Sequence, residues 1–430
     1  MNSKLKAVTA AFALLAATTI PTGAHANACQ PTKQLASTNI AQLHVEVLEA
    51  ATGKTLFARN ELSPQRSASV MKVLTAAVAL DVLGPDYQVE TNVYSDPRNP
   101  GRIYLVGAGD VTLSRMPGNV TSYYAKAPKL DTLTRQIALW TQVSGAQITE
   151  VVIDNSLYGG DAEWHPSWNR KGLSDGYMAP VSAIQIDGAR LTSSSNSLVW
   201  LAKRTSKPVV QAGKLFVASL NKRGLATGLV ATYGKVPANA QVIATVKSRP
   251  MSEWITNMLR VSDNTLAEAL GRLSSLKAGY DGRMQSLTPL FKEVLKDRGL
   301  DTGKLNIVDA SGLSSQNAVP VSLVNDVLTL VNLGVGDYSV IEAGMPVSGE
   351  RGSLRTRFAI GNLKAAKGLV AAKTGYISTG YSLAGFLTAR DGTELIFTVY
   401  NLSSQARISQ RNAMDNLVYR FYQCGANLSG

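Results

Sequence analysis

The pattern of apolar and polar positions predicts a β-hairpin followed by a buried helix near the start of the chain. Residues 44–48 and 54–58 carry strand-like patterns on either side of the turn-forming run 50–53. Residues 67–80 are rich in good helix formers, begin with a serine suited to a helix start, and are apolar on nearly every face. A helix of this kind belongs inside a protein core.

A different texture begins at about residue 87 and continues to about residue 246. Short β-branched or aromatic segments are separated here by Gly, Pro, Asn and Ser, as in a domain built from short strands. The strand candidates are residues 103–106, 150–153 and 242–246. We therefore expect residues 87–246 to form a β-rich domain inserted into another domain, which consists of residues 27–86 and 247–430.

The rest of the chain returns to mixed helical and strand patterns. Residues 251–260 and 265–276 have helical periodicity and are interrupted at Ser262-Asp263-Asn264. Three strand patterns and one helical pattern follow, at residues 368–373, 381–388, 394–400 and 409–422. Asp391-Gly392, between the last two strands, is a strong hairpin signal. The fold class expected is therefore α/β with a large β-rich insertion.

The first 26 residues have the composition of an export signal. Lys4 and Lys6 precede the apolar run 7–20, and the small-residue triplet Ala24-His25-Ala26 ends the segment. No later apolar run reaches the ~18 residues that a membrane span requires. We therefore expect a signal peptide over residues 1–26, and a mature protein without a transmembrane anchor in the periplasm or cell-wall space.

Net charge narrows the choice of partners. The formal charge is +13, and loss of the two signal lysines leaves +11. A basic protein suits nucleic acid, an anionic surface or a polyanionic wall, and export argues against nucleic acid. An anionic cell wall fits better, and a charge that serves only solubility is the open alternative.

Histidine and cysteine counts exclude several kinds of catalytic site. The composition, 45% hydrophobic and 17% charged, is that of a globular protein. Its three histidines are His25, which leaves with the signal, His44 in a strand pattern and His165 in a loop pattern, and it has two cysteines. These counts allow no thiolate zinc cluster and leave little scope for a histidine base. A hydrolase with this composition needs a different base.

Ser69 and Lys72 supply a candidate nucleophile and base. Positions i and i+3 of a helix share a face, so the hydroxyl and the amine can come within hydrogen-bond reach. Burial in the apolar helix disfavours the charged lysine, and an uncharged amine can accept a proton. The Ser-x-x-Lys spacing alone is weak support, because it recurs at Ser3, Ser219 and Ser274.

Two further motifs follow in a characteristic order. Ser262-Asp263-Asn264 lies at the interruption between two helical patterns, and Lys373-Thr374-Gly375 ends a strand pattern. Lys-Thr-Gly occurs once in the chain, whereas Ser-x-Asn recurs. Penicillin-binding proteins and serine β-lactamases carry Ser-x-x-Lys, Ser-x-Asn and Lys-Thr-Gly in this order.

With these motifs the sequence resembles the low-molecular-mass class C penicillin-binding proteins, D-alanyl-D-alanine carboxypeptidases and endopeptidases of the penicillin-binding protein 4 type. The resemblance covers nearly all of the mature chain and includes residues 104–113, 152–156, 309–314 and 345–349. It implies a transpeptidase-like α/β domain, with a five-stranded sheet between helices, that is split by a large insertion. Two features depart from the family pattern: the insertion is shorter, and Tyr376 stands where threonine commonly follows Lys-Thr-Gly.

The resemblance also implies a mechanism through an acyl-enzyme on Ser69. Lys72 accepts the proton of Ser69, and the backbone N–H groups of Ser69 and Tyr376 form the oxyanion hole. The other family roles concern the leaving group and the substrate. Ser262 passes a proton to the leaving amine, Asn264 binds the substrate amide, Lys373 supplies positive potential, and Thr374, Gly375 and Tyr376 bind substrate.

The substrates implied are peptidoglycan stem peptides, with β-lactams as covalent inhibitors, and the scheme requires no metal or organic cofactor. Asp154 ends a strand pattern and is expected to line a pocket for the diamino acid of the stem peptide; a plain turn residue is the alternative. Arg355 is a second candidate ligand for a carboxylate in that region, and a solvated arginine is the alternative.

Two other functions remain open. A serine β-lactamase shares all three motifs, but the stretch between Asn264 and Lys373 lacks the Glu-x-x-Leu-Asn element of class A enzymes. The large insertion also argues against a β-lactamase. A catalytically silent wall-binding relative has no chemical reason to keep all six motif side chains. The peptidase is therefore the favoured function.

Cys29 and Cys424 are the two cysteines of a chain that we expect to reach an oxidising compartment. In the fold of the resembled family the N-terminal segment and the last helix lie together against one sheet, which implies that the two cysteines can pair. Lipidation of Cys29 and a free Cys424 are the alternatives. The leucine usual three positions before a lipidated cysteine is Ala26 here.

Overall fold

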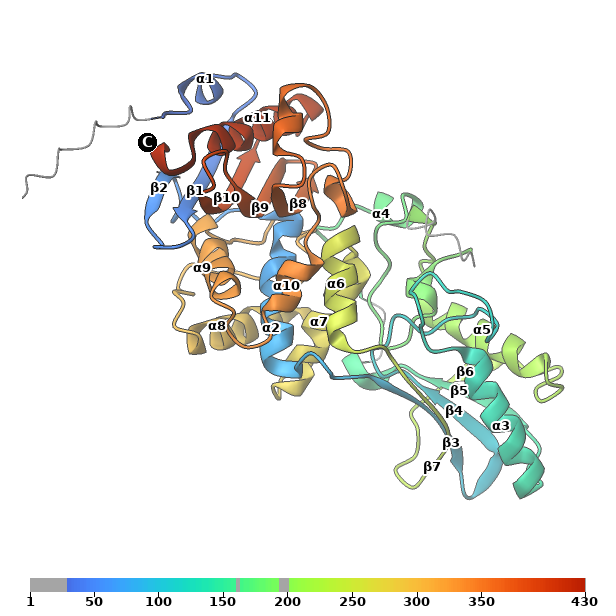
Figure 1. Ribbon diagram of the computed structural model, residues 1–430. Coiled ribbons are helices and arrows are strands. Elements are labelled where there is room, and N and C mark those ends of the chain that lie inside the picture. The colour runs from blue at the N-terminus through green and yellow to red at the C-terminus, as the bar shows by residue number, and fades with distance from the viewer. Residues whose placement is uncertain (1–28, 160–162, 193–200, 430) are drawn as a thin grey trace, which may run out of the picture.

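The chain folds into two domains, each built on a five-stranded sheet (Figure 1). The computed structural model describes residues 29–159, 163–192 and 201–429. The expected signal peptide, residues 1–26, lies outside these ranges. The first domain carries both ends of the described chain, and the second contains the strands between Glu90 and Lys247. This is the predicted α/β class with a β-rich second domain.

The first sheet is antiparallel throughout and joins the start of the chain to its end. Its strands lie in the order β2-β1-β10-β9-β8. Their bounds are β1 (Gln42–Glu49), β2 (Thr55–Arg59), β8 (Val370–Ile377), β9 (Gly380–Thr388) and β10 (Glu394–Leu402). Val45 of β1 lies opposite Val399 of β10. The two hairpins predicted from the sequence, β1–β2 and β9–β10, are both present.

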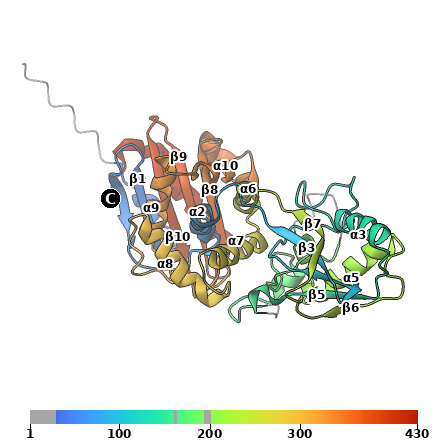
Figure 2. The ribbon, with the colours of Figure 1, turned by 90° about the horizontal axis from the view of Figure 1, so that it is seen from below.

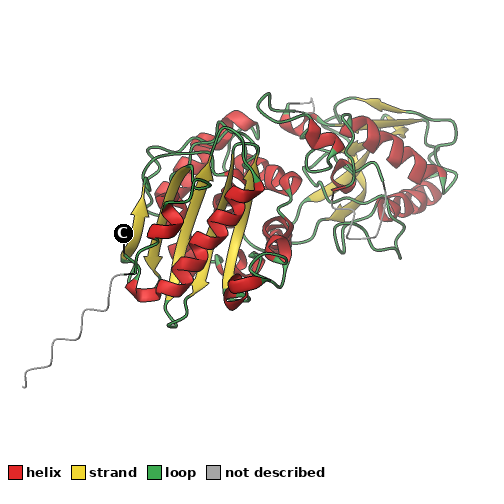
Figure 3. Cartoon of the chain, turned by 90° about the horizontal axis from the view of Figure 1, so that it is seen from above, coloured by secondary structure: helices red, strands yellow, loops and turns green. Residues whose placement is uncertain are grey.

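Alternation of side chains along β10 gives this sheet a core on each face. Phe397 and Val399 pack toward α11 (Ile408–Cys424), whereas Ile396 and Tyr400 belong to the core on the opposite face. The helices of that opposite face are α2 (Met71–Leu83), α6 (Met251–Val261), α7 (Asn264–Lys277), α8 (Leu287–Asp297), α9 (Val321–Asn332) and α10 (Ser339–Gly344) (Figure 2). Figure 3 shows the same sheet from the other side, with a helix lying across it. The short α1 (Thr32–Leu35) lies beside α11. No helix among the described residues is both long and apolar enough to cross a membrane.

Helix α2 is the central element of the helical layer. Every residue from Met71 to Leu80 is buried, as the uniformly apolar pattern predicts. The helix starts later than the pattern, because Ala68–Val70 forms a 3-10 turn. The serine at the start of the pattern, Ser67, makes no side-chain cap; its hydroxyl donates to the Ala68 carbonyl instead.

The second sheet has the order β6-β5-β4-β3-β7 and is parallel across its first three strands. Its strands are β3 (Glu90–Asp96), β4 (Asn99–Val106), β5 (Glu150–Asp154), β6 (Ala231–Tyr233) and β7 (Gln241–Lys247). Parallel neighbours need crossover connections, which contain α3 (Leu130–Ser144) and α5 (Pro208–Asn221). The sequence analysis identified three of these strands, β4, β5 and β7, and missed both helices, which contain residues of low helix propensity: threonines in α3, and Pro208 and Gly213 in α5.

Two segments connect the domains and lie side by side (Figure 2). The backbone N–H of Ser248 donates to the Val89 carbonyl at 2.8 Å, and that of Met251 donates to the Tyr87 carbonyl at 3.0 Å. The path out of the first domain after α2 is therefore bonded to the path back into α6. This pairing holds the second domain beside α2, α6 and α7, the helices next to the Ser-x-x-Lys and Ser-x-Asn motifs of the first domain.

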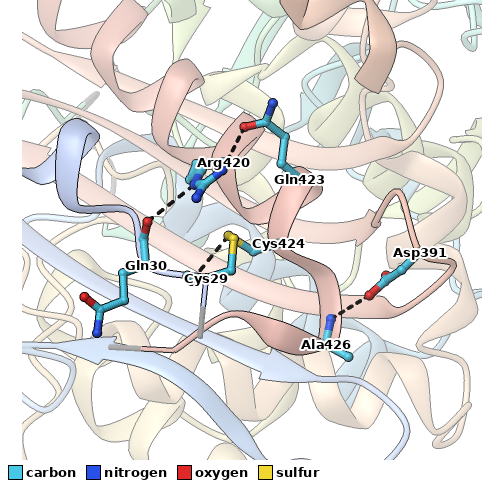
Figure 4. Close-up of a disulfide and its surroundings, with 7 residues drawn as sticks. All are labelled: Cys29, Gln30, Asp391, Arg420, Gln423, Cys424 and Ala426. Atoms are coloured by element: carbon cyan, nitrogen blue, oxygen red, sulfur yellow. Dashed lines mark hydrogen bonds between the residues drawn. A yellow bond between two sulfur atoms is a disulfide. The ribbon is translucent and has the colours of Figure 1, made fainter. Parts of the chain in front are cut away.

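A disulfide between Cys29 and Cys424 ties the start of the described chain to the end of α11 (Figure 4). The backbone N–H of Cys29 also donates to the Asn427 carbonyl at 2.9 Å. Nearby, the carboxylate of Asp391 accepts the backbone N–H of Ala426 at 2.9 Å. These contacts attach the start of the described chain and the β9–β10 turn to the C-terminal end of α11.

Candidate active site

Ser69 and Lys72 lie in contact at the start of the central helix. Ser69 belongs to the 3-10 turn that precedes α2, and Lys72 lies in the first turn of α2. The Nζ atom of Lys72 is 3.0 Å from the Oγ atom of Ser69, 2.7 Å from Oδ1 of Asn264 and 2.6 Å from the carbonyl oxygen of Ser311. Ser69 is partly exposed, whereas Lys72 is completely buried. A substrate can therefore reach the hydroxyl while the amine remains away from water.

Burial lowers the pKa of Lys72 to about 8. The carboxylates of Asp309, Glu268 and Asp263 act in the opposite direction. Glu268 is itself completely buried, and this burial, together with the charge of Asp309, raises its pKa to about 7. Near pH 8 a large fraction of Lys72 is uncharged, which is the form that can accept a proton.

Ser262 and Lys373 form a second hydroxyl–amine pair. The Nζ atom of Lys373 donates to the Ser262 Oγ at 2.8 Å and to the Thr374 carbonyl at 2.7 Å. Ser262 has a left-handed backbone, with φ of 60°, and this conformation turns the chain from α6 into α7. Burial, followed by the charge of Lys72, brings the pKa of Lys373 well below its ordinary value.

Asn264 is held from two sides. Its Oδ1 accepts from Lys72, and its Nδ2 donates to the carbonyl of Tyr177, a residue of the second domain, at 2.9 Å. The preceding Asp263 caps α7, because its carboxylate accepts the Leu266 N–H at 3.0 Å. An amide NH2 group has two donors, so one N–H of Asn264 remains for a substrate carbonyl.

Gly375 allows strand β8 to approach the Ser69 turn closely. A methyl group at this position would lie 2.0 Å from the Ser382 Oγ and 2.9 Å from the Ser69 nitrogen. Ser382 donates in turn to the Ser67 carbonyl at 2.7 Å, which fastens β9 to the same turn. Only glycine fits at position 375 without displacing the strand from Ser69.

Thr374 and Tyr376 flank this glycine and have different surroundings. The hydroxyl of Thr374 is 2.6 Å from that of Ser353, a residue that the sequence analysis did not single out. Tyr376 is 57% exposed, and its ring lies against that of Tyr381 with centroids 4.8 Å apart. The phenol therefore does not replace the hydroxyl of the threonine common at this position, and Ser353 provides a second hydroxyl beside Thr374.

Ser311 and Glu268 are two more groups that sequence reasoning missed. The Ser311 carbonyl accepts from Lys72, and the Ser311 N–H donates to the carboxylate of Glu268 at 2.9 Å. Asp309 shapes this loop by accepting the backbone N–H groups of Gly312 and Ser314 at 2.6 Å each. A backbone carbonyl leaves no residue-type signal, so the Asp-Ala-Ser-Gly run was the one available clue.

Asp154 and Arg355 take no part in these contacts. Asp154 is buried at the end of β5, where its Oδ1 accepts the Ser156 N–H and its Oδ2 accepts the Val236 N–H, each at 2.8 Å. Arg355 is exposed and follows the turn that carries Ser353. The carboxylate of Asp154 thus organises a turn within the second domain, and Arg355 lies near the Thr374 side of the centre.

The site has the chemistry of a serine acyl-transfer enzyme: a partly exposed hydroxyl beside a buried amine, with a second hydroxyl–amine pair opposite. Within the described ranges, no group of three or more His, Cys, Asp or Glu side chains is placed to hold a metal ion. The chain belongs to the D-Ala-D-Ala carboxypeptidase 3 (S13) family, whose model matches residues 30–199 and 193–421. By this family membership it is a serine-type D-alanyl-D-alanine carboxypeptidase.

Similar proteins agree with this assignment. A carboxypeptidase of Mycobacterium tuberculosis is 31% identical over 399 residues, which cover 91% of this chain and 82% of that protein. Carboxypeptidase DacB of Mycolicibacterium smegmatis is 29% identical over 397 residues, with the same two shares. The crystal structure of penicillin-binding protein 4 from Haemophilus influenzae has a TM-score of 0.74 at 19% identity and covers 91% of this chain and 99% of that one. The predicted family and fold class are both confirmed.

Proposed function

We propose that the protein hydrolyses the D-Ala-D-Ala bond of peptidoglycan stem peptides through an acyl-enzyme on Ser69. The contacts of Lys72 are the observation that carries this proposal. Its amine meets two oxygens that only accept, Oδ1 of Asn264 and the carbonyl of Ser311, and one hydroxyl, that of Ser69. An uncharged amine has two N–H donors and one lone pair. The two acceptors take both donors, and the lone pair faces Ser69.

Acylation follows from this arrangement. The Oγ atom of Ser69 attacks the carbonyl carbon of the penultimate D-Ala while its proton moves to Nζ of Lys72. The backbone N–H groups of Ser69 and Tyr376 receive the negative oxygen of the tetrahedral intermediate. The close approach at Gly375 supports this role, because it brings β8 against the Ser69 nitrogen. Loss of one such donor typically costs ~3 to 4 kcal/mol of barrier.

Ser262 and Lys373 serve the leaving group. The Ser262 hydroxyl gives its proton to the departing amine and receives in exchange the proton that Lys72 took from Ser69. The neighbouring Lys373 polarises the Ser262 hydroxyl through their 2.8 Å contact. Burial lowers the pKa of Lys373 in the free protein. The carboxylate of an arriving substrate has the opposite effect, because a nearby negative charge favours the ammonium form. Water then attacks the acyl-enzyme and releases the shortened peptide.

The remaining substrate contacts suit a peptide that ends in a carboxylate. Thr374 and Ser353 present two adjoining hydroxyls beside Lys373, and one N–H of Asn264 is free for the substrate amide. Asp154 is proposed to line the pocket for the diamino acid of the stem peptide, where its carboxylate orders the adjoining loops, and Arg355 is proposed to bind a carboxylate in that region. The same site is proposed to cleave peptide crosslinks as an endopeptidase and to be acylated by β-lactams. Nucleic acid is not a proposed partner.

Export to the periplasm or cell-wall space is part of the proposal. The signal pattern over residues 1–26 and the Cys29–Cys424 disulfide both support an oxidising compartment outside the cytoplasm. The formal charge of the whole chain is +13, and the +11 that remains without the two signal lysines suits an anionic wall.

Release of D-Ala from a peptide ending in D-Ala-D-Ala tests the activity. Wild-type protein and a Ser219→Ala control are expected to release D-Ala equally, because Ser219 carries the same Ser-x-x-Lys spacing on α5 of the second domain. Ser69→Ala is expected to release none while keeping its circular dichroism spectrum. Release at the wild-type rate by Ser69→Ala would show that Ser69 is not the nucleophile.

A further inference from the structure

The second domain reaches into the Ser262-Asp263-Asn264 element through buried polar side chains. The Tyr124 hydroxyl donates to Oδ2 of Asp263 at 3.0 Å, and Nη2 of Arg190 lies 3.6 Å from the same oxygen. Both partners come from the chain between β4 and β7, whereas Asp263 stands at the start of α7. The other oxygen of Asp263 caps α7 through the Leu266 N–H. Asp263 is therefore fixed by both domains at once.

Arg190 is itself held in one position. Its residue is 1% exposed, and its guanidinium lies over the Tyr123 ring, 3.2 Å from the centroid. Its Nη1 donates to the Asp187 carbonyl at 2.9 Å and to the Tyr124 hydroxyl at 3.3 Å. Arg204, another buried arginine, donates to the Gly176 carbonyl at 2.9 Å and to that of Gly188. The group that faces Asp263 is thus pre-ordered within the second domain.

Unusual backbone conformations lie next to both ends of this ion pair. Asp187, Gly188 and Ala189 have consecutive φ values of 52°, 59° and 61° just before Arg190. Ser262, just before Asp263, has φ of 60°. Non-glycine residues in this region cost of order 1 to 3 kcal/mol each and persist where surrounding contacts hold them. The Arg190–Asp263 ion pair and the Tyr124–Asp263 hydrogen bond connect these two turns across the domains.

The contribution of the Arg190–Asp263 ion pair to folding stability does not by itself explain why it is present. Burial would raise the pKa of Asp263, but the charges of Arg190 and Arg204 and the bonds from Leu266 and Tyr124 bring it below its ordinary value. A buried ion pair seldom contributes more stability than apolar side chains of the same size, because both charges lose their water. What the pair does provide is a defined position for Asp263, whose chain neighbours Ser262 and Asn264 contact Lys373 and Lys72.

We propose that Arg190 and Tyr124 of the second domain are positioning residues for catalysis, which set Ser262 and Asn264 in place through Asp263. The inference rests on the roles proposed above for those two residues. The insertion is then a working part of the active centre, in addition to any substrate surface that it supplies. The bond from Asn264 Nδ2 to the Tyr177 carbonyl is a second, direct contact of the same kind.

Acylation by a fluorescent penicillin, measured with the full-length mature protein, tests this inference. Asp263→Asn keeps an oxygen that can cap α7 and removes the negative charge that faces Arg190. Arg190→Gln removes the partner charge. Each variant is expected to acylate about 10- to 100-fold more slowly than wild type, as misplacement of reacting groups by about 1 Å does. The double variant is expected to be no slower than the slower single variant, because coupled residues are not additive.

A matched control separates positioning from stability. Arg357 and Asp415 form another buried ion pair, with side chains 8% and 5% exposed, on the α11 face of the first sheet. Asp415→Asn is expected to lower the melting temperature and leave the acylation rate unchanged. Tyr124→Phe, which removes one hydroxyl, covers the case in which Arg190→Gln fails to fold, and it is expected to slow acylation severalfold.

Three results would overturn the inference. These are acylation at the wild-type rate by folded Arg190→Gln and Asp263→Asn, a full rate for Tyr124→Phe, or additive losses in the double variant. Two other variants test the proposed function separately from this inference. Normal acylation by Ser262→Ala and Asn264→Ala would show that these residues lack the catalytic roles on which the inference rests. Partial recovery of the rate in Arg190→Lys, which restores the charge, would support it.

Discussion

The Nζ atom of Lys72 lies 3.0 Å from the Oγ atom of Ser69, and its two other contacts are carbonyl-type oxygens. Because neither of those oxygens can donate, the Ser69 hydroxyl is the group from which this amine can take a proton. Complete burial favours the uncharged amine that this transfer requires. In the proposed mechanism Ser69 is therefore the nucleophile and Lys72 is the general base, which is the role of histidine in Ser-His-Asp hydrolases.

Replacing Lys72 by arginine should abolish the base. A guanidinium remains protonated at any ordinary pH and cannot accept the Ser69 proton. We expect Lys72→Arg to acylate with penicillin at least ~100-fold more slowly than wild type, within the range for loss of a general base. Lys222→Arg, in the Ser-x-x-Lys sequence that begins at Ser219, is the control and should retain the wild-type rate. A near-normal rate for Lys72→Arg would mean that another group is the base.

The rate of acylation should depend on pH through Lys72. Since the uncharged amine is the active form and its pKa is about 8, the rate should rise as pH increases through about 8 and then level off. Glu268 is ionised in that range and raises the pKa of Lys72. Glu268→Gln, which keeps an acceptor for the Ser311 N–H, should therefore move the midpoint to lower pH. A midpoint that stays in place or moves to higher pH would contradict this coupling.

Gly375 should tolerate no side chain. In Gly375→Ala the new methyl group would meet the Ser382 Oγ and the Ser69 nitrogen, so β8 must move away from the Ser69 turn. We expect acylation to be slower by about 10-fold or more. Complete loss of one oxyanion-hole donor raises the activation barrier by about 3 to 4 kcal/mol, and a displaced donor loses part of that stabilisation. Gly234→Ala is the control, because a methyl group there has 3.4 Å to the nearest side-chain atom. Equal acylation rates for the two variants would show that β8 adapts without loss.

The Cys29–Cys424 disulfide should stabilise the first domain without affecting the chemistry. It joins positions 395 residues apart and packs with α11, on the face of the sheet opposite α2. In the chain-entropy model so long a loop contributes at most ~6 kcal/mol, and measured values are often smaller. The double variant Cys29→Ser, Cys424→Ser should unfold at lower urea concentration and acylate at the wild-type rate. An unchanged urea midpoint, or an intact mass that indicates free thiols or a lipid on Cys29, would contradict the prediction.

The sequence predicted the strands of the first sheet and the helices α2, α6, α7 and α11, which carry strong local patterns, but it identified none of α8, α9 and α10 between residues 287 and 344. The uniformly apolar run at α2, the hairpin signal at Asp391-Gly392 and the helix break at Ser262 each appear where expected. The second domain was predicted less completely. Its helices contain residues of low helix propensity, threonines in α3 and Pro208 and Gly213 in α5, and a parallel sheet places its partners far apart in the sequence.

The residues of the active site were likewise predicted only in part. The motif side chains Ser69, Lys72 and Lys373 were singled out from the order of the three motifs and the family resemblance, and the structure brings Lys72 to Ser69 and Lys373 to Ser262. The Ser311 carbonyl was not singled out, because a backbone atom has no residue-type signature. The Arg190–Asp263 contact joins residues from different domains, and a pattern of neighbouring residues cannot predict such a pairing.

Intact mass after addition of penicillin tests the proposed acyl-enzyme most directly. The wild-type protein should gain the mass of one penicillin, the adduct should persist, and fragmentation should place it on Ser69. Ser69→Ala should gain nothing, and Ser219→Ala should be labelled as fully as wild type. Rapid loss of the adduct with release of hydrolysed penicillin would instead indicate a β-lactamase, and no adduct on the folded wild-type protein would indicate a silent wall-binding relative.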